Sequence, residues 1–253
     1  MNHEVNTQHS KGFTIIELVL AMTLISLLLL GIAMTIVQIA NIYNHGMIAK
    51  EVNQTSRSLG DELTSALRTN GSFSTDATAH RYVGGKEWGG RLCVGQYSYI
   101  WNYGTALKSL NPNRNKFLTS TASNSGLNRG AVSGASTYEI SFVKIPDGGG
   151  AYCTPGGSGA YPDVDPTKAV ELLKTGNHSL ALHAFSVLST PTAQDSLSSQ
   201  QLYHFSYTIG TSDLAALNDN QTKCKEPSET GSDPNYCSVE QFTLVLRAVG
   251  GVN

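Results

Sequence analysis

The sequence has little charge and no excess of either sign. Charged residues make up 14% of its 253 residues, and the formal net charge is −2. Proteins that bind nucleic acid through its phosphates usually carry a basic patch. The composition therefore gives no indication of direct nucleic-acid binding.

The sequence also lacks the motifs of common catalytic and metal sites. It contains no HExxH, GxSxG or Walker motif, and the stretch "GGGAYCTPGGSG" lacks the Lys-Ser/Thr pair of a phosphate loop. The acidic stretches "DVDP" and "LNDN" do not follow the EF-hand pattern, so we interpret both as solvated turns rather than calcium sites. We expect no catalytic residue, no metal site and no cofactor, and hence no enzyme.

Charge is almost absent from one long segment near the N-terminus. Glu17 is the only Asp, Glu, Lys or Arg between Lys11 and Lys50. The apolar run from Leu18 to Ile42 is about 25 residues long, whereas about 20 suffice to cross a bilayer. A cleaved secretory signal has a shorter apolar region, of about 7–15 residues. The pattern favours a membrane anchor over a cleaved signal peptide.

The residues at the start of this segment form an ordered set. A short polar leader ends in a lysine, followed by Gly12, Phe13, Thr14, two isoleucines, Glu17 and the apolar run. This order resembles the N-terminal signature of type IV pilins and type II secretion pseudopilins. The resemblance implies that a prepilin peptidase cuts after Gly12 and methylates the new N-terminus of Phe13. Glu17 then becomes the fifth residue of the mature chain.

The resemblance also suggests why a carboxylate lies in an apolar segment. A charge in the middle of a spanning helix costs roughly 2.5–3.5 kcal/mol, and such groups are usually paired or functional. The free ammonium of Phe13 on one subunit can offset the charge of Glu17 on its neighbour, whereas either charge alone in lipid is costly. We therefore expect Glu17 to be a determinant of subunit assembly.

Partners and location follow from the same resemblance. The expected partners are a prepilin peptidase, other pilins or pseudopilins, the inner-membrane assembly platform and membrane lipid. Charges flank the span on both sides and indicate its direction only weakly. The signature implies a single-pass inner-membrane protein with a cytoplasmic leader and an external head, which later enters a pilus or pseudopilus in the periplasm or at the cell surface.

The four cysteines suit an extracytoplasmic head. They are Cys93, Cys153, Cys224 and Cys237, and none forms a CxxC pair. An even count on the translocated side suggests two disulfides, for which three connectivities are possible. We favour Cys224–Cys237, which closes a polar loop, and Cys93–Cys153 then follows by elimination. Four free buried thiols are the alternative.

Beyond the span, the apolar periodicity predicts that the helix continues to about residue 70. Its apolar residues recur at spacings of four and seven, and Asn70-Gly71 is a plausible stop. These residues are Ile48, Val52, Leu59, Leu63 and Leu67. Such a stripe must pack on something, and the domain that follows is the obvious candidate.

The remainder is rich in predicted strands and turns. Five segments show strand-like patterns: 92–103, 138–145, 179–189, 201–210 and 239–249. Asp165, Pro166 and Gly176 mark the start and end of a predicted short helix. Two turn-rich segments, 111–134 and 146–166, are expected to be exposed.

Together these features predict an α+β fold with a long N-terminal helix packed on an antiparallel β-rich head. The expected divisions are a leader (1–12), the helix (13–70, with the membrane segment at about 18–42) and the head (71–253). The stretch "EVNQTSRSLGDELTSALR" and the closing strand "VEQFTLVLR" resemble J-type pseudopilins and W-type minor pilins. The expected function is that of a minor structural subunit, and the alternative is a membrane-anchored surface binding protein or adhesin that acts outside a filament.

Overall fold

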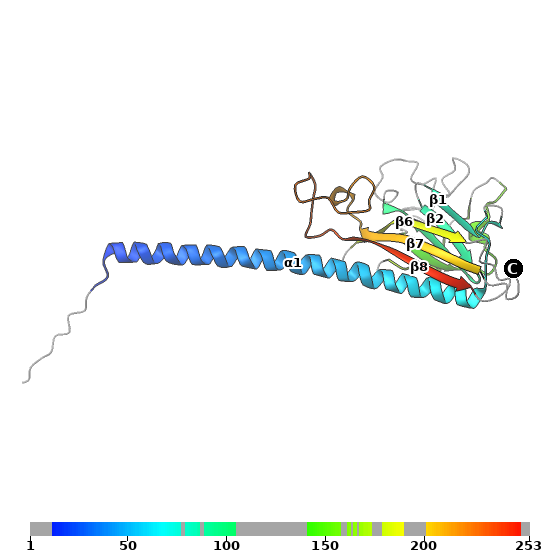
Figure 1. Cartoon of the computed structure of the whole chain (residues 1–253), viewed down its shortest axis with the longest axis horizontal. Coiled ribbons are helices and arrows are strands. Elements are labelled where there is room, and N and C mark those ends of the chain that lie inside the picture. Colours follow the sequence, from blue (N-terminus) through cyan, green and yellow to red (C-terminus); the bar gives the residue numbers. More distant parts are fainter. Residues whose placement is uncertain are drawn as a thin grey trace, which may run out of the picture. The chain divides into compact units, whose positions relative to one another are not determined.

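The computed structural model is shown in Figure 1. The chain forms two compact units, residues 1–44 and 45–253. The described residues are 12–76, 79–86, 89–104, 141–157, 161–162, 164–165, 167–173, 179–189 and 201–248. The predicted leader up to Lys11, the segment 111–134 and the first three residues of the strand predicted at 138–145 lie outside them.

A single helix, α1 (Ile15–Asn70), runs through both units. In the first unit its large apolar side chains are all exposed, and an 18-residue window has a mean hydropathy of 2.6. By length and composition, this helix can cross a membrane. It ends where the sequence predicts, because Gly71 adopts a left-handed conformation (φ 78°) that a side chain would disfavour.

The second unit contains two antiparallel sheets. The five-stranded sheet has the order β1 (Tyr82–Lys86), β2 (Gly89–Val94), β3 (Tyr97–Asn102), β4 (Phe142–Pro146) and β5 (Val170–Glu171). The three-stranded sheet has the order β6 (Leu180–Ser189), β7 (Gln201–Thr211) and β8 (Val239–Ala248). Short 3-10 helices lie at Ala151–Cys153 and Leu214–Ala216. The predicted α+β fold is confirmed.

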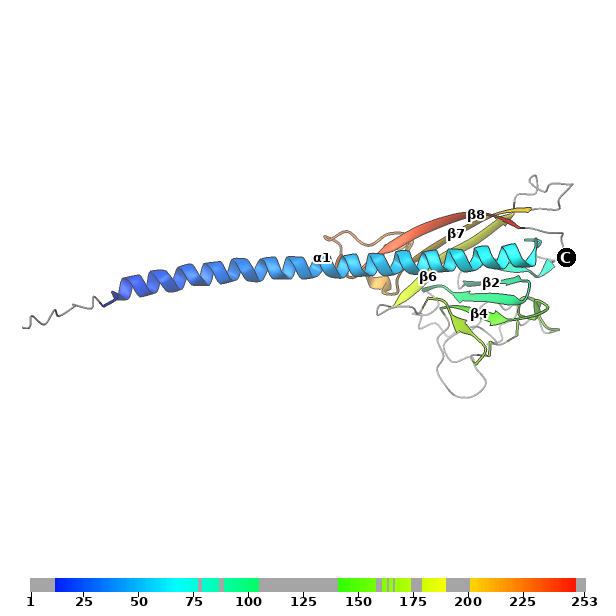
Figure 2. The same ribbon diagram turned by 90° about the horizontal axis from the view of Figure 1, so that it is seen from below.

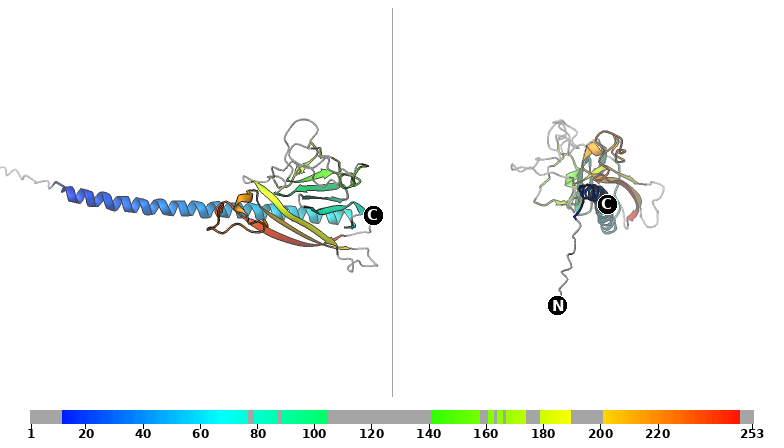
Figure 3. Two further views of the ribbon diagram at one scale, coloured as in Figure 1. Left: turned by 90° about the horizontal axis from the view of Figure 1, so that it is seen from above. Right: turned by 90° about the vertical axis from the view of Figure 1, so that its left-hand side faces the viewer.

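The second half of α1 packs across both sheets: Figures 2 and 3 show β6–β8 on one side of the helix and β2 and β4 on the other, and Figure 1 shows the labelled strands of both sheets on the same side of it. The whole apolar stripe predicted from its periodicity is buried in one core with residues of both sheets. Tyr207 of β7 donates a hydrogen bond to the Ser56 carbonyl of α1 at 2.8 Å. A Cβ at Gly60 would lie 3.2 Å from Leu244 of β8, so the missing side chain allows the sheet to approach closely.

Strands β7 and β8 show the predicted alternation. Tyr203, Phe205, Tyr207 and Ile209 point into the core and are no more than 1% exposed. In β8 the even-numbered apolar residues pack against the core, while the odd-numbered residues between them are exposed. A period of two therefore identified both strands and the faces that they bury.

The strand predicted at 92–103 is wrong, because this segment is a hairpin. β2 and β3 pair in register from Val94↔Tyr97 onward, which leaves a two-residue turn at Gly95 and Gln96. Gly95 has φ 58°, as the first central residue of such a turn requires. The strand before it, β1, was missed, and its register with β2 is shifted between Val83 and Lys86.

The short helix predicted after Asp165 is also wrong. Asp165 does accept hydrogen bonds from the backbone N–H (3.0 Å) and hydroxyl (2.6 Å) of Thr167, but the chain then turns into β5. The Glu171 carboxylate accepts the backbone N–H of Phe142 at 2.7 Å, which ties β5 to β4. A tertiary bond thus outweighs the local helical signal, which extends no further than one turn. Pro166 and residues 174–178 lie outside the described residues.

The segment 146–166 was expected to be exposed, but two of its residues, Asp147 and Cys153, are buried. Asp147 is 8% exposed and Cys153 is fully buried. Burial would raise the pKa of Asp147, but hydrogen bonds from the Ser98 hydroxyl and from three backbone N–H groups outweigh it and hold the pKa below its usual value. The carboxylate therefore organises the loop that carries Cys153.

Both favoured disulfides are present in the structure. Cys93 pairs with Cys153, 60 residues apart, and Cys224 pairs with Cys237, 13 residues apart. The first joins β2 to the loop after β4, and the second closes the polar loop before β8.

We predict that the longer loop gives the larger stabilisation. In the chain-entropy model, loss of Cys224–Cys237 costs about 3 kcal/mol and loss of Cys93–Cys153 about 4 kcal/mol. Paired Cys→Ser variants of each bridge, compared by denaturant unfolding of the detergent-solubilised chain, test this order. An equal or reversed order would show that native-state contacts, rather than loop closure, dominate.

Candidate functional site at the start of the helix

The residues that carry the N-terminal signature form a capping box. Thr14 precedes the first helical residue, and its backbone N–H (3.2 Å) and hydroxyl (3.1 Å) both donate to Oε2 of Glu17. In return, the Glu17 backbone N–H donates to the Thr14 hydroxyl at 3.3 Å. This reciprocal pattern satisfies backbone N–H groups that a helix start otherwise leaves without partners. Glu17 therefore has a role within its own chain.

Sequence analysis missed this role, although its signal was visible. Thr-x-x-Glu before an apolar run is the sequence pattern of a capping box. We predicted a partner for Glu17 only in a neighbouring subunit, whereas Thr14, three residues earlier in the same chain, is also a partner. The two roles are compatible because only one carboxylate oxygen is used by Thr14.

The two residues of the predicted cleavage site are open. A Cβ built at Gly12 would have no neighbour within 4 Å, and Phe13 is 85% exposed. Nothing in the described chain covers the peptide bond between them. A protease can therefore reach this bond without unfolding the helix.

The hydroxyl groups within the apolar run are satisfied by their own helix. The hydroxyls of Thr23, Ser26 and Thr35 donate to backbone carbonyls three or four residues earlier, at 2.7–2.9 Å. Hydroxyl groups bonded in this way can enter hydrocarbon without an unsatisfied donor. Glu17 is thus the one charged group that the segment would carry into a membrane.

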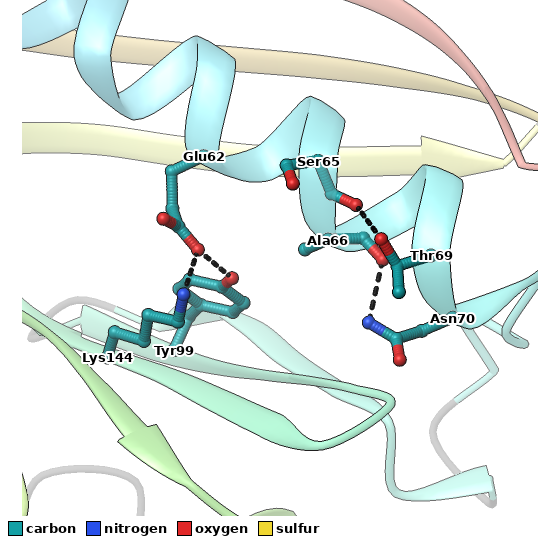
Figure 4. A network of polar contacts seen from close by, with 7 residues as sticks. All are labelled: Glu62, Ser65, Ala66, Thr69, Asn70, Tyr99 and Lys144. Atoms are coloured by element: carbon teal, nitrogen blue, oxygen red, sulfur yellow. Dashed lines mark hydrogen bonds and ion pairs between the residues drawn. The ribbon is translucent and has the colours of Figure 1, made fainter.

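In the head, a polar cluster joins α1 to the five-stranded sheet (Figure 4). Oε1 of Glu62 accepts hydrogen bonds from Tyr99 of β3 at 2.7 Å and from Lys144 of β4 at 2.5 Å. Burial raises the pKa of Glu62, but the bonds from Lys144 and Tyr99 and the charge of Lys144 together lower it below its usual value. Lys144 also lies 4.0 Å from the centre of the Tyr97 ring. The cluster fixes the helix on the sheet and presents no catalytic arrangement.

His183 joins β6 to the loop before the second disulfide. Its Nδ1 lies 3.0 Å from Oε1 of Gln221, and its Nε2 lies 3.1 Å from the Thr211 carbonyl. Because that carbonyl can only accept, Nε2 carries the proton of the neutral ring, and Nδ1 then accepts a hydrogen bond from the Gln221 side-chain amide once its nitrogen, rather than Oε1, faces the ring. Burial lowers the pKa of His183, although the bonds to Gln221 and Thr211 oppose this shift. The folded protein therefore favours the neutral imidazole.

We predict that acidification weakens the fold through His183. Its folded pKa is below the unfolded value, so its contribution is present above the unfolded pKa, about 6.5, and is lost as the pH falls through the folded pKa. Between about pH 7.5 and about pH 5, the Tm of the wild type should therefore fall further than the Tm of His183→Gln. Each kcal/mol of unfolding free energy that is lost lowers Tm by about 2–4 °C in a protein of this size. Parallel Tm curves for the two proteins would contradict this prediction.

Among the described residues, no group of three or more His, Cys, Asp and Glu side chains is placed to hold a metal ion. The residues predicted from sequence fall into separate places. Gly12, Phe13 and Glu17 lie together at the helix start, and the four cysteines lie in two bridges of the head.

Comparison with known proteins gives a family match for the N-terminal segment. Residues 7–36 match the family model of the prokaryotic N-terminal methylation motif, which is typical of type IV pilins and pseudopilins. No curated protein and no solved structure matches the chain. The match confirms the resemblance of the N-terminal segment and covers the residues that form the capping box.

Proposed function

We propose that this chain is a minor pilin or pseudopilin, a structural subunit that joins the initiation or tip complex of a type IV pilus or a type II secretion-like filament. The observation that carries the proposal is the N-terminal methylation motif at the start of a 56-residue helix whose first half is predominantly apolar and exposed. Such a surface is stable only in lipid or against other apolar helices.

In the proposed pathway, a prepilin peptidase removes residues 1–12 and methylates Phe13. The anchor holds the chain in the inner membrane with its leader in the cytoplasm and its head outside, where the two disulfides form. The assembly platform then transfers the helix from lipid to the packed helices of a filament. Glu17 favours this transfer, because a neighbour's N-terminal ammonium can meet its carboxylate only in the packed state.

The second half of α1 supports a structural role for the head. It is fixed against both sheets by the buried stripe and by the Glu62 cluster. A head held in this way follows the movement of its helix, as a filament subunit requires. We propose a non-enzymatic role, of the J-type pseudopilin or W-type minor pilin kind.

Sedimentation of sheared filaments tests the proposal. In cells that express the chain with a pilus or pseudopilus system, it should appear in the filament fraction only when the peptidase and the major subunit are both present. A membrane-anchored adhesin that acts alone would remain in the membrane fraction and reach the surface without the major subunit. The second result would contradict the proposal.

A further inference from the structure

The outer strand of the three-stranded sheet, β8, has an edge without the usual protection. Natural edge strands are commonly short, bulged or interrupted by proline or lysine. β8 is ten residues long, pairs with β7 without a register shift, and contains neither proline nor lysine. Its six central residues, 241–246, are uncharged.

The other described strand edges are protected. β1 has a register shift, and β5 is two residues long. β6 has a shift between Leu182 and Ala184, and Tyr103 forms a bridge with Leu182 on its far side. Of the strands that the structure describes, β8 alone has a long regular edge.

The hydrogen-bond phase shows which groups of β8 face outward. The Thr211 N–H donates to the Ser238 carbonyl, and these residues continue the register Gly210↔Val239. Directly opposite antiparallel residues alternate between bonded and non-bonded pairs. Even-numbered residues of β8 therefore bond to β7, and the odd-numbered residues direct their N–H and C=O groups toward the edge. No backbone hydrogen bond from another described residue reaches these outward groups.

The side chains along this edge are apolar on the helix side and mixed on the outer face, where Gln241, Thr243 and Arg247 lie beside Val245. Phe242, Leu244 and Leu246 are only half-buried on the helix side, so one flank of each is open. On the outer face Val245 is 59% exposed. An added strand with alternating apolar residues would complete the row on the helix side.

We propose that the free edge of β8 is a docking site for an extended segment of a different extracytoplasmic protein, which adds to the sheet as an antiparallel strand. Main-chain hydrogen bonds would supply affinity, and the side-chain rows would supply specificity. Charge at the two ends of β8 defines the segment further: a basic residue opposite Glu240 and an acidic residue opposite Arg247.

A second copy of the chain is a poor occupant of this edge. β8 runs in the same direction as α1, because Asn53 bonds to Glu240 and Gly60 lies against Leu244. Antiparallel pairing of two β8 strands would therefore set two α1 segments in opposite directions, whereas the subunits of one filament all point the same way. This choice of partner rests on the proposed function, whereas the free edge of β8 does not.

A designed peptide tests the site on the full chain in detergent micelles. The nine-residue peptide pairs with residues 239–247: it has leucines opposite Phe242, Leu244 and Leu246, threonines opposite residues 239, 241, 243 and 245, a glutamate opposite Arg247 and a lysine opposite Glu240. Fluorescence anisotropy should show saturable binding, and a peptide with the glutamate and lysine exchanged should bind several-fold more weakly. Amide exchange should slow at Gln241, Thr243 and Val245, but not at the even-numbered residues between them.

A matched pair of variants separates the edge from the side chains. Thr243→Pro removes an outward N–H without removing a bond to β7, and proline is tolerated at such edge positions. It should weaken peptide binding at least tenfold, whereas Thr243→Ala, which keeps the N–H, should bind within about twofold of wild type. If Thr243→Pro does not fold, the amide-exchange pattern of the wild-type protein with bound peptide tests the proposal by itself.

Four results would overturn the proposal. The peptide does not bind saturably, or it binds Thr243→Pro as tightly as the wild type. Alternatively, the peptide slows amide exchange elsewhere than at the odd-numbered residues of β8, or the chain forms a dimer that Thr243→Pro dissociates. The last would make a second copy the occupant. Leader processing is measured separately, so failure of edge binding and failure of the proposed function can be told apart.

Discussion

Glu17→Gln should insert into the membrane and lose its leader normally, yet fail to enter filaments. Glutamine at this position keeps the capping box, because Gln serves as well as Glu at the third helical residue. It loses only the charge, whose cost for insertion is at most the roughly 2.5–3.5 kcal/mol of a charge at the helix centre, and with it the attraction to a neighbour's ammonium. Incorporation should fall at least tenfold, measured by immunoblot of sheared filaments against the membrane fraction.

Two further variants separate the cap from the charge. Thr14→Ala removes the cap and keeps the carboxylate, at a cost of about 0.5–2 kcal/mol in helix stability. Glu17→Ala removes the charge and the two bonds to its carboxylate, but keeps the bond from the backbone N–H of residue 17 to the Thr14 hydroxyl. If the charge drives assembly, Glu17→Gln fails as completely as Glu17→Ala, while Thr14→Ala assembles. If Glu17→Gln assembles and Thr14→Ala does not, the carboxylate serves its own helix and the proposed intersubunit role is wrong.

Gly12→Val should abolish processing altogether. The structure leaves open space at this position, so a valine there would not disturb the chain's own packing. A branched side chain would instead restrict the backbone on which the peptidase acts. We expect the leader to remain on essentially all of the protein and filament entry to be lost with it.

Gly31→Val is the matched control, because a Cβ at Gly31 also has no neighbour within 4 Å. It carries the same substitution within the apolar helix, away from the cut, whereas Gly12 precedes the helix. It should be processed at the wild-type level. Equal loss of processing in both variants would place the defect in membrane insertion rather than at the cleavage site.

Periodicity predicted those parts of the fold in which one face is buried along a whole element. The stripe from Ile48 to Leu67 repeats with the helical period, and Tyr203 to Ile209 alternate as a strand does. Both sets are buried as the patterns predict. Long elements with one buried face carry many concordant residues, so a single exception does not change the assignment.

Prediction failed where a few residues or a distant partner decide the structure. One residue, Gly95, turns an apparent strand into a hairpin, and its signal was lost in the alternating residues around it. The helix after Asp165 gives way to β5 because Glu171 bonds to the backbone of β4, which is distant in sequence. Local propensity does not contain that contact.

The candidate site at the helix start was predictable because all of its residues are neighbours in sequence. Gly12, Phe13 and Glu17 lie within one short stretch, and the capping box that joins Thr14 to Glu17 was visible there too. The free edge of β8 was not predictable. It depends on strand order and on the phase set by Thr211 and Ser238, and neither follows from the sequence of β8 alone.

The most direct test of the account is the intact mass of the chain from cells with and without a prepilin peptidase. The account predicts loss of residues 1–12 and one added methyl group on Phe13 in cells with the peptidase, and a full-length unmethylated chain without it. An identical mass in both, or a cut at any other bond, would contradict it.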